Sequence, residues 1–252
     1  MEFNLKSNFK VGALAITCQN NGVGILNSIT KIYTCQCVDN YYGQNCQYQP
    51  LNSTTFINST ILTQELGVSL LNLIGVPLNS EATRVYQASK DGFGASDFHS
   101  KVDGILGTLT VVKSTYGNIF GGFTSLSWGL PSNSYSDPSA YIFSLVNQHN
   151  NYSYIFNQIS TYQSNPIYSI YANPQNGPIF GGSHDFAIYD QSNSKNNSHS
   201  RLGYSYQAPL NYTFSSDQAN SFLAGSRFFQ TLEVEVYTII SIYNISFIWS
   251  IF

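Results

Sequence analysis

Charged side chains are scarce in this chain. Among its 252 residues, Lys and Arg number 10 and Asp and Glu number 13, so 9% of the chain is charged and the formal net charge is −3. A surface of this composition carries no strong field of either sign and offers little to nucleic acid or to an anionic membrane. We therefore expect no nucleic-acid partner. The length allows one sizeable core with a small appendage.

Motifs of catalysis and cofactor binding are also missing. No G-x-S-x-G elbow occurs, and the pairs Gly121-Gly122 and Gly181-Gly182 lack the G-K-[ST] that follows a phosphate loop. The adjacent side chains of Ser183-His184-Asp185 point to opposite faces of an extended strand, so they cannot form a relay. Metal-spaced pairs are absent among the four histidines, which are His99, His149, His184 and His199. We expect no enzyme activity, no cofactor and no metal.

Three aspartates, Asp91, Asp97 and Asp103, lie close together in the sequence beside Lys90 and Lys101. They lack the spacing of an EF-hand calcium loop, and lysine neighbours do not suit a cation site. We interpret these aspartates as helix caps and as residues of a solvated face.

All cysteines of the chain lie in one short stretch, at Cys18, Cys35, Cys37 and Cys46. A zinc site and a redox pair are the alternatives to disulfides, but C-x-C spacing is poor for zinc and no histidine is nearby. A segment of about 30 residues with few large apolar side chains cannot bury enough surface to fold alone, so disulfides would have to replace a core. We expect disulfides, and with them an oxidising compartment.

The cysteine spacing, in which C-x-C is followed by Tyr41-Tyr42-Gly43 and a last cysteine, resembles the second half of an EGF-like module. That module normally has six cysteines, paired first to third, second to fourth and fifth to sixth. The resemblance implies the bonds Cys18–Cys35 and Cys37–Cys46, because Gly24 stands in place of the third cysteine and its partner, the first, is also missing. We predict a partial EGF-like module over residues 14–47.

A linker is predicted over residues 48–60, which are rich in turn formers and lack periodicity. Sequons for asparagine glycosylation occur there and elsewhere, and the candidate sites are Asn52, Asn58, Asn151 and Asn211. A chain so rich in Asn, Ser and Thr produces sequons by chance, so they add little to the case for secretion.

The two ends of the chain leave alternatives open. Val11–Thr17 is apolar but at the short limit for a signal peptide, and a missing leader is the other interpretation. The apolar tail at residues 241–252 is short for a membrane span, which needs about 20 apolar residues. Membrane association through this tail is an alternative that we do not favour over a gene-model artefact.

An ordered set of segments after about residue 60 resembles the TLDc domain of the oxidation-resistance protein family. The segments are SKDGFGASDFHSK (89–101), TLTVVKS (108–114), NIFGGFTSLSW (118–128), Ser139–Leu145, Gly177–Gly182, Asp185–Tyr189 and Phe229–Tyr237. The resemblance implies a TLDc domain over residues 61–240, with two antiparallel sheets packed as a sandwich and flanking helices.

Residue patterns agree with that fold. Leu62, Leu66, Leu70 and Ile74 recur at helical spacing after Thr63 or Thr60, either of which is a plausible N-cap. Short β-branched and aromatic runs separated by Asn, Gly, Pro and Ser are typical of an antiparallel sandwich. The candidate strands are Val85–Gln87, Gly107–Val112, Ile119–Leu126, Ala140–Asn147, Ile167–Tyr171, Phe186–Tyr189 and Leu232–Tyr237. We expect an α+β, mainly β fold.

The last candidate strand carries a specific expectation. Its apolar residues Leu232, Val234 and Val236 alternate with Glu233 and Glu235. Alternation of this kind predicts one buried and one solvated face, with both glutamates on the solvated side.

Two functional classes follow from these features. The cysteine cluster favours an extracellular or cell-surface interaction protein, in which an EGF-like stalk carries a TLDc head that binds an unidentified protein or glycan. The alternative is a cytoplasmic protein of oxidative-stress protection or of vacuolar proton ATPase regulation, because intracellular TLDc proteins are associated with those roles. No cysteine follows Cys46, so the TLDc region has no thiol chemistry of its own.

Overall fold

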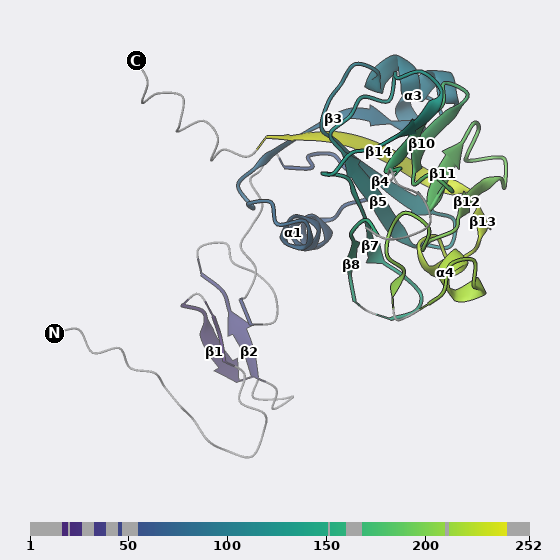
Figure 1. Cartoon of the computed structure of the whole chain (residues 1–252). Coiled ribbons are helices and arrows are strands. Elements are labelled where there is room, and N and C mark those ends of the chain that lie inside the picture. The colour runs from purple at the N-terminus through teal and green to yellow at the C-terminus, as the bar shows by residue number, and fades with distance from the viewer. Residues whose placement is uncertain are drawn as a thin grey trace, which may run out of the picture. The chain divides into compact units, whose positions relative to one another are not determined.

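The computed structural model describes residues 17–19, 21–26, 33–38, 45–46, 55–150, 152–159, 168–209 and 212–240. The chain divides into two compact units, Met1–Leu51 and Asn52–Phe252 (Figure 1). None of the described helices is both long enough and apolar enough to cross a membrane. The predicted tail at 241–252 lies outside the described residues.

The first unit contains a small antiparallel hairpin. Strand β1 (Val23–Leu26) pairs with β2 (Tyr33–Gln36), and Gly24 lies opposite Cys35. Disulfides join Cys18 to Cys35 and Cys37 to Cys46.

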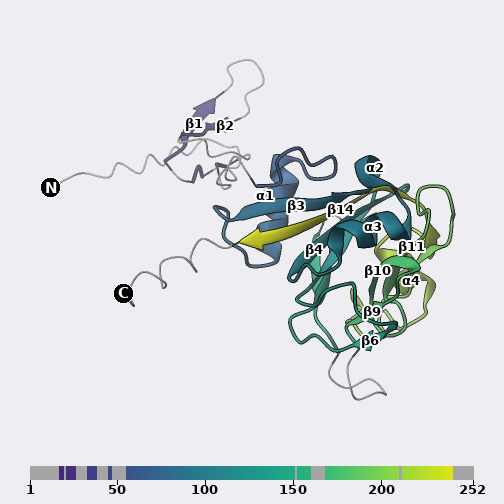
Figure 2. The same cartoon turned by 90° about the horizontal axis from the view of Figure 1, so that it is seen from above.

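The second unit contains two six-stranded antiparallel sheets that face each other (Figures 1 and 2). The first sheet has the order β3 (Glu81–Gln87), β14 (Thr231–Ile240), β4 (Thr108–Ser114), β5 (Ile119–Thr124), β7 (Tyr141–Val146) and β8 (Tyr154–Phe156). The second has the order β13 (Phe228–Phe229), β12 (Ser198–Ser200), β11 (Phe186–Tyr189), β10 (Asn176–Phe180), β9 (Ile170–Ala172) and β6 (Asn133–Tyr135). The predicted mainly β sandwich is confirmed.

The core between the two sheets is rich in aromatic rings. Phe120 of the first sheet meets Phe186 of the second edge-on, with ring centroids 5.3 Å apart. Gly122 leaves room for the ring of Phe180, whose Cε1 atom would lie 2.7 Å from a Cβ atom at position 122. The prediction that the glycine pairs serve close packing therefore agrees with the structure at this position.

The described helices of the second unit flank the sheets. They are α1 (Gln64–Leu73), α2 (Ala88–Asp91), α3 (Ala95–Val102) and α4 (Asp217–Phe222). Of the two predicted N-cap candidates, Thr63 caps α1, because its side chain accepts a hydrogen bond from the Leu66 amide at 3.3 Å. Helix α1 packs against β7 and lies on the side of the first sheet that faces away from β10 and β11 (Figure 1).

The expectation of a solvated face on β14 was wrong. Glu233 is 5% exposed and Glu235 is 0% exposed, whereas Leu232 is 52% exposed. The outward face of this strand is covered by residues 55–62, of which Phe56 packs edge-on against Tyr237 with centroids 5.0 Å apart. Leu232 is exposed where the pairing with β4 shifts register between Thr231 and Glu233, and from Glu233 to Tyr237 both faces of the strand are buried.

Residues 55–60, which the sequence assigns to the linker, belong to the second unit in the structure. That unit starts at Asn52, and Thr55 and Phe56 are buried in it. The sheet domain therefore starts earlier than residue 61.

Candidate functional site

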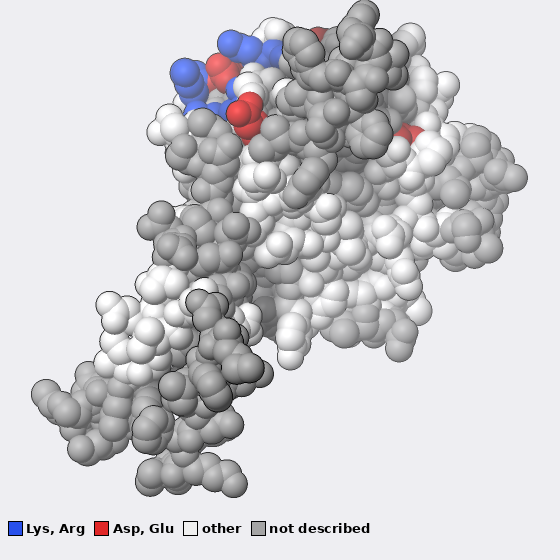
Figure 3. All heavy atoms as spheres, turned by 90° about the vertical axis from the view of Figure 1, so that its left-hand side faces the viewer, with Lys and Arg blue, Asp and Glu red and all other residues white. Residues whose placement is uncertain are grey.

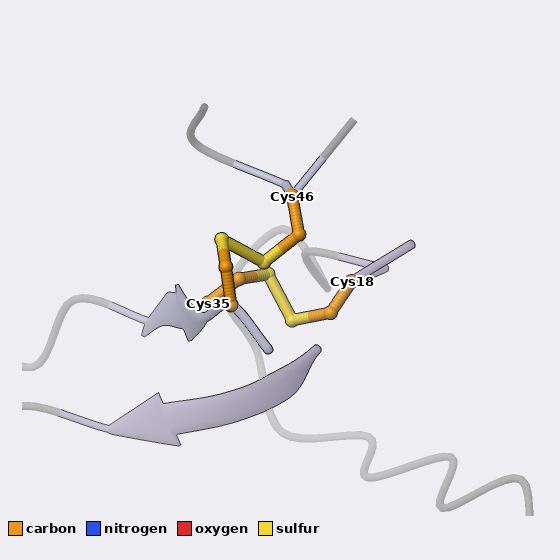
Figure 4. Close-up of a disulfide and its surroundings, with 4 residues drawn as sticks. Cys18, Cys35 and Cys46 are labelled. Carbon is orange, nitrogen blue, oxygen red and sulfur yellow. A yellow bond between two sulfur atoms is a disulfide. The ribbon is translucent and has the colours of Figure 1, made fainter. Parts of the chain in front are cut away.

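The four cysteines come together at one end of the small hairpin, where two disulfides lie side by side (Figure 4). Their Cα atoms are 5.6 Å apart in Cys18–Cys35 and 5.2 Å apart in Cys37–Cys46. These are the pairs that the resemblance to an EGF-like module implies. Free cysteines are absent from the residues that the structure describes. In the described part of this unit, the two disulfides are the covalent links that hold the hairpin to the flanking chain.

The second unit carries a groove of about 560 Å³ along strand β3. Every residue of β3 lines it, from Glu81 to Gln87, and the rest of the lining is Ile57, Asn58, Lys90, Asp91 and Lys101. A groove that follows a whole strand is an elongated site, which suits an extended ligand.

Strand β3 is an edge strand. It pairs with β14 on one side, and no described strand pairs with its other side. The pairing is regular from Glu81↔Ile240 to Arg84↔Tyr237, and the register then shifts at Val85, which forms a bulge. An unpaired edge exposes backbone N–H and C=O groups, and a bulge is one device by which proteins limit unwanted pairing there.

Charged side chains gather around this groove, while the rest of the face in Figure 3 is largely uncharged where it is described. Arg84 lies 3.3 Å from the buried carboxylate of Glu235. Lys101 lies 3.4 Å from Asp91, whose other oxygen accepts a hydrogen bond from the Gln87 amide at 2.9 Å. Lys90 is exposed at the same end. The end of the groove next to α2 and α3 therefore carries two accessible ammonium groups, those of Lys90 and Lys101, beside the carboxylate of Asp91.

Glu235 binds the segment 55–62 to the sheet and pairs with Arg84, which lines the groove. It accepts hydrogen bonds from the Ser59 hydroxyl at 2.6 Å, the Thr60 amide at 2.9 Å and the Tyr237 hydroxyl at 2.7 Å, in addition to its ion pair with Arg84. A buried carboxylate with this many donors is stable as a structural clasp.

Glu233, two residues before Glu235 on the same strand, has a similar structural role. It accepts hydrogen bonds from the Ser89 amide at 3.0 Å and from the Ser89 hydroxyl, and another from the Thr60 hydroxyl at 3.1 Å. This carboxylate therefore links α2 and the segment 55–62 to β14. Both glutamates are occupied by protein donors, and neither lines the groove.

The three aspartates considered for calcium have separate structural roles. Asp97 accepts the Gly94 amide at 2.9 Å at the start of α3, and Asp103 lies 2.7 Å from Nδ1 of His99. Asp91 is held by Lys101 and by the Gln87 amide. In the described ranges, no group of three or more His, Cys, Asp or Glu side chains is arranged to hold a metal.

Two histidines that are distant in sequence meet on the outer face of the second sheet. The ring centroids of His184 and His199 lie 5.6 Å apart, and Tyr171 and Tyr189 contact them. Burial lowers the pKa of His199 to about 4, with help from His184 and Arg201, and burial also lowers the pKa of His184. Because Arg201 would repel a bound cation as it repels a proton, this pair does not support a metal site.

Ser183-His184-Asp185 does not form a catalytic relay. Asp185 is fully buried and accepts backbone N–H groups of Gly203 at 2.9 Å, Tyr204 at 3.0 Å and Ser205 at 2.9 Å. Burial raises the pKa of Asp185 to about 6, although these hydrogen bonds act in the opposite direction. The carboxylate organises the 203–206 loop, while the His184 ring points to the outer aromatic cluster.

The glycosylation candidates are only partly visible. Asn58 is exposed in a turn with a φ of 59°, and its carbonyl oxygen accepts a hydrogen bond from Arg84 at 2.6 Å. The sequon residues Ser59 and Thr60 are engaged with the buried glutamates. Asn52, Asn151 and Asn211 lie outside the described residues.

Most of this groove was not predicted from the sequence. A strand was expected only from Val85, whereas β3 begins at Glu81, because Glu81–Arg84 is mostly polar and lacks a β-branched run. Polar composition is itself a sign of an edge strand, and that signal was available. The sequence alone could not show that Lys90 and Lys101 stand beside this edge.

Comparison with known proteins identifies one domain. The family model of the TLDc domain matches residues 55–240. A search of curated proteins found no match for the chain.

Proposed function

The chain belongs to the TLDc domain family, and on this premise we propose that it is a non-enzymatic interaction protein of the cell surface or the extracellular space. In this proposal, residues 14–47 form a partial EGF-like stalk and the TLDc domain is the head that binds a protein or glycan partner. The two disulfides of the first unit carry the proposal.

Disulfides argue for the compartment because the described hairpin buries little of its apolar side chains. In the first unit, Val23 is 58% exposed and Ile25 is 44% exposed, so these side chains contribute little to a core. Removing a native disulfide from a small domain costs about 2–5 kcal/mol, which would leave such a unit unfolded in the reducing cytosol.

The binding role of the head is supported by its surface. The groove along β3 joins an unpaired strand edge to a cluster of charged side chains, which is the combination expected of a protein-binding surface. Asp91 and Asp97, in contrast to the exposed lysines, accept hydrogen bonds from backbone amides of the protein itself. Fold alone does not determine function, so the binding role of the head rests on this surface, while the disulfides carry the extracellular part of the proposal.

The test is to count free thiols in the full chain after expression through a secretory route. Alkylation of the folded protein followed by mass spectrometry should find four protected cysteines, and digestion should release linked Cys18–Cys35 and Cys37–Cys46 peptides. Reduction before alkylation should expose all four. The variant Cys35→Ser is the matched control, since it should free Cys18 and leave Cys37–Cys46 intact.

A second candidate function follows from the family match itself. Intracellular TLDc proteins are associated with protection against oxidative stress and with regulation of the vacuolar proton ATPase. If all four thiols of the unreduced protein are alkylated, the extracellular proposal fails and this intracellular role becomes the better one.

A further inference from the structure

We propose that the free edge of β3 binds an extended peptide by strand addition, with an acidic side chain of the peptide facing Lys90 and Lys101. This inference rests on the proposed function as a binding protein, and it names the class of partner and the strand that receives it. Three features support this inference: the length of the β3 edge, its backbone groups that are open to pairing, and the lysines beside it.

The edge of β3 differs in length from the other sheet edges. It has seven residues, whereas the edge strands β6 and β8 have three each and β13 has two. Short edges are a common protection against pairing with other chains. A long edge lined by a groove along its whole length lacks that protection and is therefore suited to receive a strand.

The open portion of the edge is Glu81–Arg84. These four residues pair regularly with Tyr237–Ile240 on their other side, so their backbone is straight. The bulge at Val85 ends this portion. Beyond it, the Gln87 amide donates a hydrogen bond to Asp91 at 2.9 Å and is therefore not available to a peptide. An added peptide would thus pair with Glu81–Arg84 and then continue past the bulge towards α2 and α3.

The side chains at that end favour an acidic residue. Lys90 is exposed, and Lys101 keeps 49% of its side chain exposed although it lies near Asp91, which is only 15% exposed. Arg84 is engaged elsewhere, since it is paired with the buried Glu235 at 3.3 Å and donates to the Asn58 carbonyl at 2.6 Å. A carboxylate of the peptide would meet two accessible ammonium groups. Because exposed ion pairs contribute little affinity, we expect the backbone hydrogen bonds to provide most of the binding and the charges to set direction and specificity.

The experiment uses the full disulfide-bonded chain and a fluorescent synthetic peptide, acetyl-Thr-Val-Thr-Val-Asp-Val-Glu-amide, with binding measured by anisotropy. Two further peptides carry N-methyl groups at alternate residues, one on the odd and one on the even positions. Strand addition uses the amides of alternate residues only, so one methylated peptide should lose binding by at least about tenfold while the other binds nearly as well as the parent. A peptide with Asn and Gln in place of Asp and Glu tests the charge.

The matched protein variants neutralise lysines in similar settings. The double variant Lys90→Gln and Lys101→Gln should weaken binding of the acidic peptide by about tenfold and leave the Asn/Gln peptide unchanged. Lys195→Gln is the control, since Lys195 is 54% exposed, lies 3.1 Å from Asp190 and does not line the groove. Thermal unfolding checks that each variant is folded. Hydrogen exchange should show new protection in Glu81–Arg84 when the peptide is bound.

Several results would overturn the proposal. Absence of binding, equal loss with both N-methylated peptides, or equal effects of the double variant and Lys195→Gln would each exclude acidic strand addition here. Dimers that protect the β3 amides without peptide would show that a second copy occupies the edge. Failed peptide binding with four protected cysteines overturns this inference alone, whereas four free thiols with intact peptide binding overturn only the extracellular function.

Discussion

At the scale of single residues, Asp185 shows how one carboxylate organises a loop. Its Oδ1 atom accepts the amides of Gly203 and Tyr204, and its Oδ2 atom accepts the amide of Ser205. Since both oxygens act as acceptors, an amide side chain of the same size cannot replace the carboxylate. The NH2 group of an asparagine would face a backbone donor.

We therefore predict that Asp185→Asn destabilises the TLDc domain by about 1–3 kcal/mol, the cost of leaving buried donors unsatisfied. Urea unfolding followed by tryptophan fluorescence measures the change, because Trp128 is buried in the core. Asp217→Asn, at the exposed start of α4, should change stability by less than about 0.5 kcal/mol. Equal stabilities for wild type and Asp185→Asn would contradict the assigned role.

The environment of His199 predicts how the stability of the domain depends on pH. Burial lowers its pKa to about 4, below the value of 6.5 that an unperturbed histidine has. Between these two values the unfolded chain binds a proton that the folded protein does not, so the free energy of unfolding falls as the pH is lowered from about 6.5 towards 4. The stability linked to neutral His199 is therefore fully present above about pH 6.5.

The variant His199→Gln removes this proton-binding site, and we expect a smaller loss of thermal stability between pH 7 and pH 4.5 than in the wild type. The comparison must be made between the two proteins, because burial raises the pKa of Asp185 to about 6 and its titration acts in the opposite direction within this range. Parallel melting-temperature profiles for the two proteins would show that His199 does not contribute.

At the scale of elements, Gly121 fixes how β4, β5 and β7 approach one another. It lies opposite Val111 on one side and Phe143 on the other. A Cβ atom here would collide with the carbonyl oxygen of Thr110 and would lie 2.7 Å from Cζ of Phe143. The β5 sequence therefore needs glycine at this place for reasons of space.

We predict that Gly121→Ala destabilises the domain by more than about 3 kcal/mol, since backbone atoms on a central strand cannot move aside cheaply. Gly117→Ala is the comparison, because nothing lies within 4 Å of its Cβ position although its φ of 84° is strained for alanine. That variant should cost about 1 kcal/mol. Chemical unfolding of both variants checks the difference, and similar losses would rule out a collision at Gly121.

At the scale of the whole molecule, residues 55–60 decide where the TLDc domain begins. Phe56 packs on Tyr237, while Ser59 and Thr60 donate hydrogen bonds to Glu235. The family match begins at residue 55, within the unit that starts at Asn52. A chain that starts at residue 61 would remove the Ser59 and Thr60 donors of Glu235, together with most of the segment that covers this face.

We predict that a protein of residues 52–252 keeps the cooperative unfolding transition of the full chain, whereas residues 61–252 lose at least about 3 kcal/mol, the cost of breaking a buried charge network. Calorimetry on the two shortened chains tests this. Equal melting temperatures would mean that the segment 55–60 does not contribute to the stability of the domain.

Much of the fold was predictable from local sequence. β-branched runs marked β4 and β14, Thr63 marked the start of α1, and the glycine pairs marked close packing, because each of these signals depends on neighbouring residues alone. The shortest strands, such as β6, β8 and β13, were not predicted, since two or three residues carry too little pattern.

Residue patterns were enough for the mainly β class, and the resemblances to the TLDc domain and to an EGF-like module implied the domain and the cysteine pairing. The burial of Glu233 and Glu235, and the position of Lys90 and Lys101 beside the open edge of β3, follow only from the folded chain. The physical reason is that alternation along a strand tells which residues share a face, whereas burial depends on what covers that face. The cover comes from residues 55–62, more than 170 positions away from Glu235, as the separation of 176 between Ser59 and Glu235 shows.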